Sequence, residues 1–308
     1  MKLYDDGGML LKLACLLLLG VLPLSAETIL VHGHRGGRAA RPENTIPAFQ
    51  YAIDQGADVL ELDLAVTKDD VLVVSHFPYI SADYPGERLC VGPEVKPHTL
   101  IRSLTLAELK KYDCGVNTLA AFPQQKAVPH TSIPTFDEVL ALAPQGKFEY
   151  NVETKIFPNH PEVAPAPEVF VRMIDEAVRR HHLESRVILQ SFDFRTLRAM
   201  KELDPQIRRS ALFGEAKYDV LMGITDSDKD FVAVGRRSEA NILSPDQSLV
   251  TPEKVAAAHA AGLQVAPYTV NDPAGWQKMA DAHVDAVITD DPAGLLAWLR
   301  AQKPSLHP

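Results

Sequence analysis

The chain has 308 residues, 46% of them hydrophobic, and a formal net charge of −9. Its length exceeds that of a usual domain, but barrel folds often reach ~250 residues as one unit. The acidic balance argues against a surface for nucleic acid or anionic membranes, because such surfaces normally carry an excess of basic residues. A small phosphorylated molecule is still compatible with this charge, since a few local cations are enough to bind one.

The first 26 residues have the pattern of a secretory signal peptide. The apolar run Leu13–Leu22 is followed by small residues at Ser25–Ala26, which suit a cleavage site. This run is too short to span a bilayer, although a buried or anchoring helix is the alternative interpretation. Either Met1 or Met9 is the start. We therefore expect an exported protein, periplasmic or secreted, with no stable membrane insertion after cleavage of the leader.

After the leader, short apolar segments alternate with helical ones. Strands are predicted at 28–34, 58–64, 147–154, 186–191, 208–212, 240–243, 264–270 and 285–290. Helices are predicted at 45–55, 166–182, 194–203, 252–261, 273–282 and 292–301. Asn44 is the expected N-cap of the first helix, and Gly56 and Gly262 lie where two helices should end. Eight such strands predict a single α/β domain over 27–308, a TIM (β/α)8 barrel.

Two features interrupt this alternation. A Lys-Asp-Asp turn and a second apolar run at 71–75 follow the second strand, which predicts an extra β-hairpin. Residues 77 to about 130 are rich in Pro and Gly with one short helical stretch at 104–112, so they predict a small insertion. The insertion contains Cys90 and Cys114, and an exported protein favours their pairing as a disulfide. Two unpaired thiols are the alternative.

Acidic side chains occur at the predicted carboxyl ends of the strands, where barrel enzymes hold their active sites. Glu61 and Asp63 lie two residues apart on one strand and therefore point the same way, as do Glu153 and Lys155. Three carboxylates converging in a barrel mouth would repel one another without a cation between them. All-oxygen ligands favour one Ca²⁺ or Mg²⁺ ion. The alternative is that each acid faces solvent or pairs with a nearby Lys or Arg.

Two histidines lie beside these acids, His34 after the first strand and His76 after the hairpin. Histidine changes its charge near neutral pH, so the pair suits general acid and base catalysis on opposite sides of a phosphorus atom. Arg35 offers a planar fork for phosphate oxygens, and Arg38 in the same turn either contacts substrate or is solvated. His32 is instead expected to be a packed strand residue.

The order of the sequence motifs resembles that of glycerophosphodiester phosphodiesterases. The motifs are HRGGRAARPENTIPAF, GADVLELDLAVTKDDVLVVSH, SLTLAELKKYDCG, IPTFDEVL, NVETK, QSFDFRTL and YTVND followed by VDAVITDDP. The resemblance covers roughly residues 29–299 and implies a TIM barrel with a small insertion after the hairpin. It also implies metal-dependent hydrolysis of glycerophosphodiesters, small-molecule substrates, to glycerol 3-phosphate and an alcohol.

Matching the motifs position by position implies roles for the catalytic, metal-binding and phosphate-binding residues. The implied catalytic histidines are His34 and His76. The implied metal ligands are Glu61, Asp63 and Glu153. The residues implied at the substrate phosphate are Arg35 and Lys155, with Glu43 in support.

One position departs from the family's pattern, which usually reads His-Asp where this chain has His76-Phe77. The missing acid would help to orient the histidine or the local turn. An alternative function is a phospholipase D-like enzyme acting on lysophospholipid or sphingolipid, which apolar residues such as Phe77 and Tyr79 at the mouth favour. A non-catalytic exported protein that binds phosphoesters is a third interpretation, but it predicts the loss of a histidine or carboxylate that this chain retains.

Overall fold

The computed structural model describes residues 29–80, 90–93, 99–216, 219 and 230–302. The expected signal peptide at 1–26 lies outside these residues, as do parts of the expected insertion. Within the described ranges, every helix is too short or too polar to cross a membrane.

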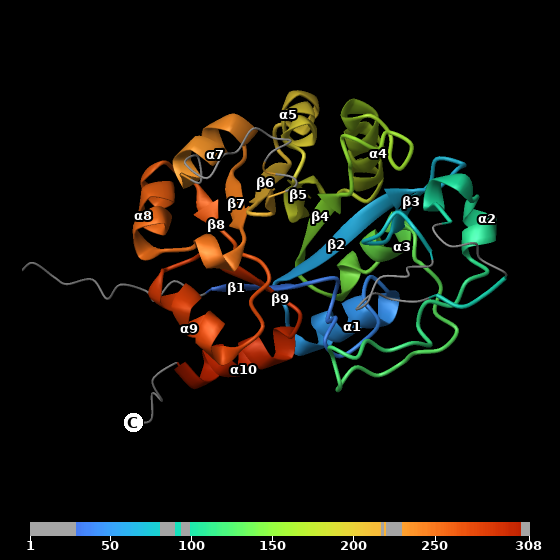
Figure 1. The fold of residues 1–308 in the computed structure, drawn as a ribbon, viewed down its shortest axis with the longest axis horizontal. Coiled ribbons are helices and arrows are strands. Elements are labelled where there is room, and N and C mark those ends of the chain that lie inside the picture. Colours follow the sequence, from blue (N-terminus) through green and yellow to red (C-terminus); the bar gives the residue numbers. More distant parts are fainter. Residues whose placement is uncertain (1–28, 81–89, 94–98, 217–218, 220–229, 303–308) are drawn as a thin grey trace, which may run out of the picture.

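A parallel sheet forms the centre of the molecule, and helices surround it (Figure 1). The strands are β1 Leu30–Gly33, β2 Val59–Val66, β4 Glu149–Thr154, β5 Val187–Ser191, β6 Arg208–Phe213, β7 Ile242–Pro245, β8 Gln264–Val265 and β9 Ala286–Thr289. Their order is β8-β7-β6-β5-β4-β2-β1-β9. The predicted eight-stranded TIM barrel is therefore confirmed, since the chain visits the strands almost in sequence around one ring.

The barrel closes between β8 and β9 through bonds that do not form a regular ladder. The predicted strand at 264–270 was too long, because only β8 is regular and Pro267 has no N–H to donate. Beyond β8, the Val270 N–H donates to the Ile288 carbonyl and the Ile288 N–H donates to the Pro267 carbonyl, each at 3.0 Å. These bonds bring the ends of the sheet together around a common mouth.

Nine α-helices lie in the described ranges, and one of them, α2 Leu106–Leu109, belongs to the insertion. Around the barrel they are α1 Ile46–Gln55, α3 Phe136–Leu140, α4 Pro167–Arg180, α5 Phe194–Leu203, α7 Phe231–Ser238, α8 Pro252–Ala260, α9 Pro273–Asp281 and α10 Pro292–Gln302. Short 3₁₀ turns lie at Ile101–Ser103, Ala143–Gln145, Glu184–Arg186 and Gln247–Leu249.

All six predicted helices are present, and α3 and α7 were missed. Helix α3 has only five residues, which is too short for an apolar period to be visible in the sequence. Its start nevertheless carries a capping box, in which the Thr135 N–H donates to the Glu138 carboxylate at 2.7 Å. Helix α7 begins after Asp230, whose carboxylate accepts a hydrogen bond from the Val232 N–H at 2.8 Å.

The N-cap of α1 is Thr45, so the prediction of Asn44 was wrong. The Thr45 hydroxyl accepts a hydrogen bond from the Ala48 N–H at 3.3 Å. Asn44 has a positive φ of 54°, and its side-chain amide donates to the Asp63 carboxylate at 2.8 Å. Both residues are good caps in isolation, and the distant partner of Asn44 decides between them. Gly56 ends the helix at φ 90°, as predicted.

The strand β3 Leu72–Val74 pairs antiparallel with β2, at the place where the sequence predicts a hairpin. A second, smaller hydrophobic cluster covers this hairpin and is separate from the main core. Its buried members are Ala65, Val73, Ile80, Ile101, Leu109, Tyr112, Cys114 and Ile133. The insertion therefore has apolar packing of its own beside the barrel.

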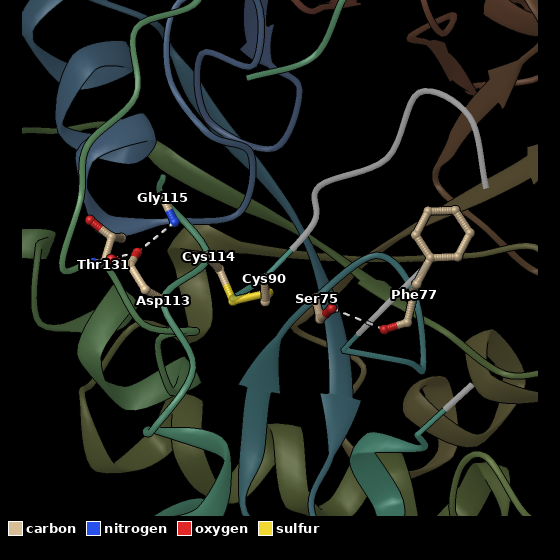
Figure 2. The surroundings of a disulfide bond; sticks show 7 residues. All are labelled: Ser75, Phe77, Cys90, Asp113, Cys114, Gly115 and Thr131. Carbon is tan, nitrogen blue, oxygen red and sulfur yellow. Dashed lines mark hydrogen bonds between the residues drawn. A yellow bond between two sulfur atoms is a disulfide. The ribbon is translucent and has the colours of Figure 1, made fainter. Parts of the chain in front are cut away.

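A disulfide joins Cys90 to Cys114 within this cluster (Figure 2). Next to it, the Asp113 carboxylate accepts hydrogen bonds from the Gly115 N–H at 2.9 Å and the Thr131 N–H at 3.1 Å. The disulfide and the Asp113 bonds tie three stretches of the insertion together.

The disulfide should stabilise the folded protein. It closes a loop with a sequence separation of 24 residues, which corresponds to about 3 kcal/mol in the chain-entropy model. We expect a thiol reductant to lower the free energy of unfolding of the wild type by roughly this amount in urea titrations. The double variant C90A/C114A is the control and should not respond to the reductant. Equal stability of the wild type with and without reductant would show that the bond contributes nothing.

His32 is a buried residue of β1, as the sequence predicts. Its Nδ1 lies 3.4 Å from the side-chain nitrogen of Asn151, and 3% of the residue is exposed. Burial, together with the positive charge of Arg208, lowers the pKa of His32 from 6.5 to about 3. The imidazole is therefore neutral in the folded protein over most of the acidic range.

This lowered pKa predicts a loss of stability in acid. Below pH 6.5 the unfolded chain binds a proton on His32, whereas the folded protein binds this proton only at about pH 3. Between these values the free energy of unfolding should fall by up to about 1.4 kcal/mol per pH unit from this residue. The variant His32→Asn, which keeps an acceptor near Nδ1, should show a correspondingly smaller slope in urea titrations across the same range. Parallel pH profiles would contradict this account.

Candidate active site

A cavity of about 620 Å³ lies at the carboxyl ends of the strands. Six of the eight residues to which the family resemblance assigns a role line it, namely His34, Arg35, Glu61, His76, Glu153 and Lys155. They come from the ends of β1, β2, β3 and β4 or from the turns that follow. Because parallel strands present their carboxyl ends on one side of a barrel, residues more than a hundred positions apart share this cavity.

The three predicted metal ligands lie together. Glu61 and Asp63 are on β2, and Glu153 on β4 is the register partner of Asp63. One carboxylate oxygen from each lies within 4.8 Å of the others, and all three residues are buried. Side chains two residues apart on a strand face the same way, so the pairing of β2 with β4 is enough to bring the three acids together.

Two basic side chains neutralise part of this negative charge. The Lys155 ammonium lies 2.7 Å from Glu153 Oε1 and 3.0 Å from Asp63 Oδ1. The Arg35 Nε lies 3.4 Å from Asp63 Oδ2. The alternative considered from the sequence, that each acid pairs with a nearby Lys or Arg, is therefore correct for Asp63 and Glu153. The Glu61 carboxylate instead accepts a hydrogen bond from the Gln190 side-chain amide at 3.3 Å and lies 3.9 Å from His34 Nε2.

The remaining charge shifts the proton equilibria of the acids. Burial and the nearby charges of Asp63 and Glu153 raise the pKa of Glu61 well above its usual range. Burial raises the pKa of Glu153 to about 7, although Lys155 acts against this. Burial also acts to raise the pKa of Asp63, but Lys155 and the other positive groups keep it well below its usual range. The all-oxygen donor set and its excess negative charge fit a hard divalent cation.

The turn after β1 holds two arginines around one acid. Arg35 has a positive φ of 51°, and its N–H donates to the Glu61 carboxylate at 2.8 Å. Its guanidinium donates to Glu43 Oε1 at 2.9 Å, and the Arg38 Nε lies 2.5 Å from Glu43 Oε2. Arg35 and Arg38 both line the cavity. Glu43 therefore orients two positive groups toward the place where an anion could bind.

His34 is held by a carboxylate that the sequence analysis missed. Its Nδ1 lies 2.5 Å from Oδ1 of Asp290, a residue that directly follows β9. The Asn271 amide donates to the other Asp290 oxygen at 2.8 Å, and the Asp290 N–H donates to the Asn271 side-chain oxygen at 2.9 Å. The available signal was the position of Asp290 at the carboxyl end of the last strand, next to the first strand in a closed barrel.

The charge of Asp290 determines which nitrogen of His34 faces the cavity. Burial acts to raise the pKa of Asp290, but the facing His34 ring and its hydrogen bond lower it to about 2. The carboxylate is therefore ionised and accepts the Nδ1 proton of His34. Nε2 is left on the other side of the ring, 3.9 Å from Glu61 Oε2. Burial, with Arg35 contributing, lowers the pKa of His34, so the ring is neutral near pH 7.

His76 follows β3 and has different surroundings. Its Nδ1 is buried and makes no hydrogen bond to any described residue. The ring packs edge to face on Phe77, with centroids 4.3 Å apart. Figure 2 shows the hydrogen bond that the Phe77 carbonyl accepts from the Ser75 hydroxyl at 2.9 Å. Burial and the positive charges of Arg35 and Lys155 lower the pKa of His76 well below its usual range.

Comparisons with known proteins agree with this arrangement. The sequence model of the glycerophosphoryl diester phosphodiesterase family matches residues 34–294. A glycerophosphodiester phosphodiesterase of Caldanaerobacter subterraneus subsp. tengcongensis is 31% identical over 271 residues, covering 88% of this chain and 98% of the relative. One of Bacillus subtilis is 32% identical over 277 residues, covering 87% and 86%. The structure of an Oleispira antarctica phosphodiesterase in complex with the product sn-glycerol-3-phosphate has a TM-score of 0.70 at 25% identity, covering 88% and 96% of the two chains.

Proposed function

Because the chain belongs to the glycerophosphoryl diester phosphodiesterase family, we propose that it hydrolyses glycerophosphodiesters to glycerol 3-phosphate and an alcohol, using one divalent metal ion and two histidines. The observation that carries this proposal is the shared cavity, which combines the three acids with His34 and His76. The sn-glycerol-3-phosphate bound to the Oleispira antarctica phosphodiesterase supports the same substrate class here.

The positive groups of the cavity would hold the phosphodiester. Arg35 and Arg38 are positioned by Glu43, and Lys155 is positioned by Asp63 and Glu153. Groups that are already oriented cost little entropy when substrate binds. Glu61, Asp63 and Glu153 would hold the metal ion, Ca²⁺ or Mg²⁺. Such an ion, when bound, would supply positive charge near the phosphate oxygens.

His34 is the proposed general base. Its Nδ1 proton is held by Asp290, so the free electron pair is on Nε2, on the side of the cavity. The ring takes a proton from the attacking hydroxyl, which is either water or a neighbouring hydroxyl of the substrate. The new bond forms between that oxygen and phosphorus, and the bond from phosphorus to the alcohol oxygen breaks. With water the product is glycerol 3-phosphate; with the substrate hydroxyl it is first a cyclic phosphate, whose ring a water molecule must then open to give glycerol 3-phosphate. Asp290 stabilises the imidazolium that results.

His76 is the proposed general acid, which protonates the departing alcohol oxygen. Burial, with the basic groups around the ring, lowers the pKa of His76, so the neutral ring must gain a proton before it can act. The negative charge of a bound phosphodiester lies close to the ring and opposes the effect of Arg35 and Lys155. Substrate binding therefore favours the protonated form that catalysis needs.

The phospholipase D-like alternative has one observation in its favour. Apolar side chains line part of the cavity, among them Phe77, Tyr79 and Phe157. A lysophospholipid would need room for its acyl chain along such a wall. Comparing lysophosphatidylcholine with glycerophosphocholine in one assay separates the two functions.

We also propose that the protein works after export, in the periplasm or outside the cell. The observation in support is the Cys90–Cys114 disulfide, because such bonds persist in oxidising compartments.

The metal site can be tested without turnover. After treatment with a chelator, the wild type should bind one Ca²⁺ or Mg²⁺ ion in a calorimetric titration. Glu153→Gln should weaken this binding at least roughly tenfold, because it removes one charged ligand. Glu215→Gln is the matched control, since Glu215 lines the same cavity outside the three-acid cluster. Equal affinities for wild type and Glu153→Gln would remove Glu153 from the site.

The two histidines can be tested by kinetics with glycerophosphocholine. His34→Ala and His76→Ala should each lower kcat by about a hundred- to ten-thousand-fold, since each removes one proton transfer. His160→Ala is the control, because His160 lines the cavity but pairs with the exposed Glu162 at 3.1 Å. A rate near that of the wild type for either of the first two variants would exclude that histidine from the mechanism.

A further inference from the structure

The insertion contains a loop, residues 116–127, whose two ends are joined by hydrogen bonds. The Cys114 N–H donates to the Thr131 carbonyl, and the Val128 N–H donates to the Gly115 carbonyl, each at 2.7 Å. Cys114 also belongs to the disulfide (Figure 2). The base of this loop is therefore fixed to the rest of the insertion.

The loop packs against the turn after β1, which contains Arg38. The Gln125 side-chain amide donates hydrogen bonds to the Arg38 carbonyl at 2.7 Å and the Arg41 carbonyl at 3.1 Å. The Lys126 N–H donates to the Ala40 carbonyl at 3.0 Å. The loop thus fixes the backbone of the turn at three carbonyl groups, one of them that of Arg38 itself.

Gln125 is oriented so that its amide nitrogen faces the turn. Its side-chain oxygen accepts a hydrogen bond from the Leu119 N–H at 2.8 Å, and because only the oxygen can accept, this bond determines the direction of the amide. The residue is 7% exposed. An apolar side chain of similar size at this position would therefore leave the loop and the turn without these bonds in a place that water reaches poorly.

The Arg38 side chain is held by two contacts. Its guanidinium carbon lies 5.1 Å from the centroid of the Phe122 ring, which is a cation–π contact. Its Nε lies 2.5 Å from Glu43 Oε2. Arg38 lines the cavity, whereas the Phe122 ring lies outside the cavity lining. The insertion therefore holds this arginine both at its backbone, through Gln125, and at its guanidinium, through Phe122.

We propose that Phe122 and Gln125 are positioning residues for Arg38, which hold its guanidinium in the orientation that binds the phosphate of the substrate. The inference rests on the proposed phosphodiesterase function and adds these residues of the insertion to its phosphate site. An arginine side chain has several rotatable bonds, so a freely moving one loses much conformational entropy when it binds an anion. Contacts that already exist in the folded protein remove that cost from substrate binding.

The test measures binding of sn-glycerol 3-phosphate to the metal-loaded protein by calorimetry. Phe122→Leu and Gln125→Leu should each weaken binding at least about threefold, the size expected for the loss of one cation–π contact or one neutral hydrogen bond. With glycerophosphocholine as substrate, KM should rise by a similar factor while kcat stays within about twofold of the wild type, because a binding interaction is lost rather than a proton transfer. Phe122→Tyr keeps an aromatic face and should bind like the wild type.

Two controls show whether the effect passes through Arg38. Tyr51→Leu removes the matching contact of the neighbouring Arg41, whose guanidinium carbon lies 5.2 Å from the Tyr51 centroid and which lies outside the cavity lining. This variant should bind glycerol 3-phosphate like the wild type. In an Arg38→Met background, Phe122→Leu should cause no further loss of affinity, because the group that Phe122 positions is absent.

Unchanged affinity in Phe122→Leu, or an equal further loss in the Arg38→Met background, would overturn the positioning role and leave the proposed function intact. If urea titration shows that Gln125→Leu does not fold, Phe122→Leu alone decides. A wild type that does not hydrolyse glycerophosphocholine, but whose glycerol 3-phosphate binding depends on Phe122 through Arg38, would overturn the function and support the positioning role. A wild type that does not bind glycerol 3-phosphate would overturn both.

Discussion

Repulsion among three buried carboxylates is the interaction on which the site depends. Glu61, Asp63 and Glu153 are brought within 4.8 Å by the pairing of β2 with β4. The fold offsets part of this repulsion with Lys155 and Arg35, yet the pKa of Glu61 stays raised by burial and by the neighbouring acids. Such an arrangement costs stability in the absence of a cation, and a divalent ion is the partner that the oxygen donors suit.

The positions of the other polar groups follow from this cluster. The Arg35 N–H donates to Glu61, and the Asn44 amide donates to Asp63, so the turn after β1 is attached to the acids at two points. That attachment gives Asn44 its positive φ and leaves Thr45 to cap α1. On the other side, closure of the barrel places Asp290 next to His34. The cavity therefore combines groups whose orientation is set before any ligand binds.

The two histidines show how differently one residue type can be supported. His34 has an ionised carboxylate on Nδ1, whereas His76 has the edge of Phe77 and no hydrogen bond to Nδ1 among the described residues. The first arrangement favours a ring that accepts a proton and holds it. The second leaves the state of the ring to the charge of whatever binds in the cavity.

The sequence by itself determined the barrel, because buried strands and amphipathic helices alternate with readable periods, and it identified the acids and histidines through their places at strand ends. It did not reveal α3, which is too short for a period, or the end of regular pairing at Pro267. Only the tertiary structure decided that Asp290 holds His34 and that Phe192 and Tyr268, which follow different strands, line the same cavity. Such contacts join residues far apart in the chain, and their distances depend on how the barrel closes, which no local pattern encodes.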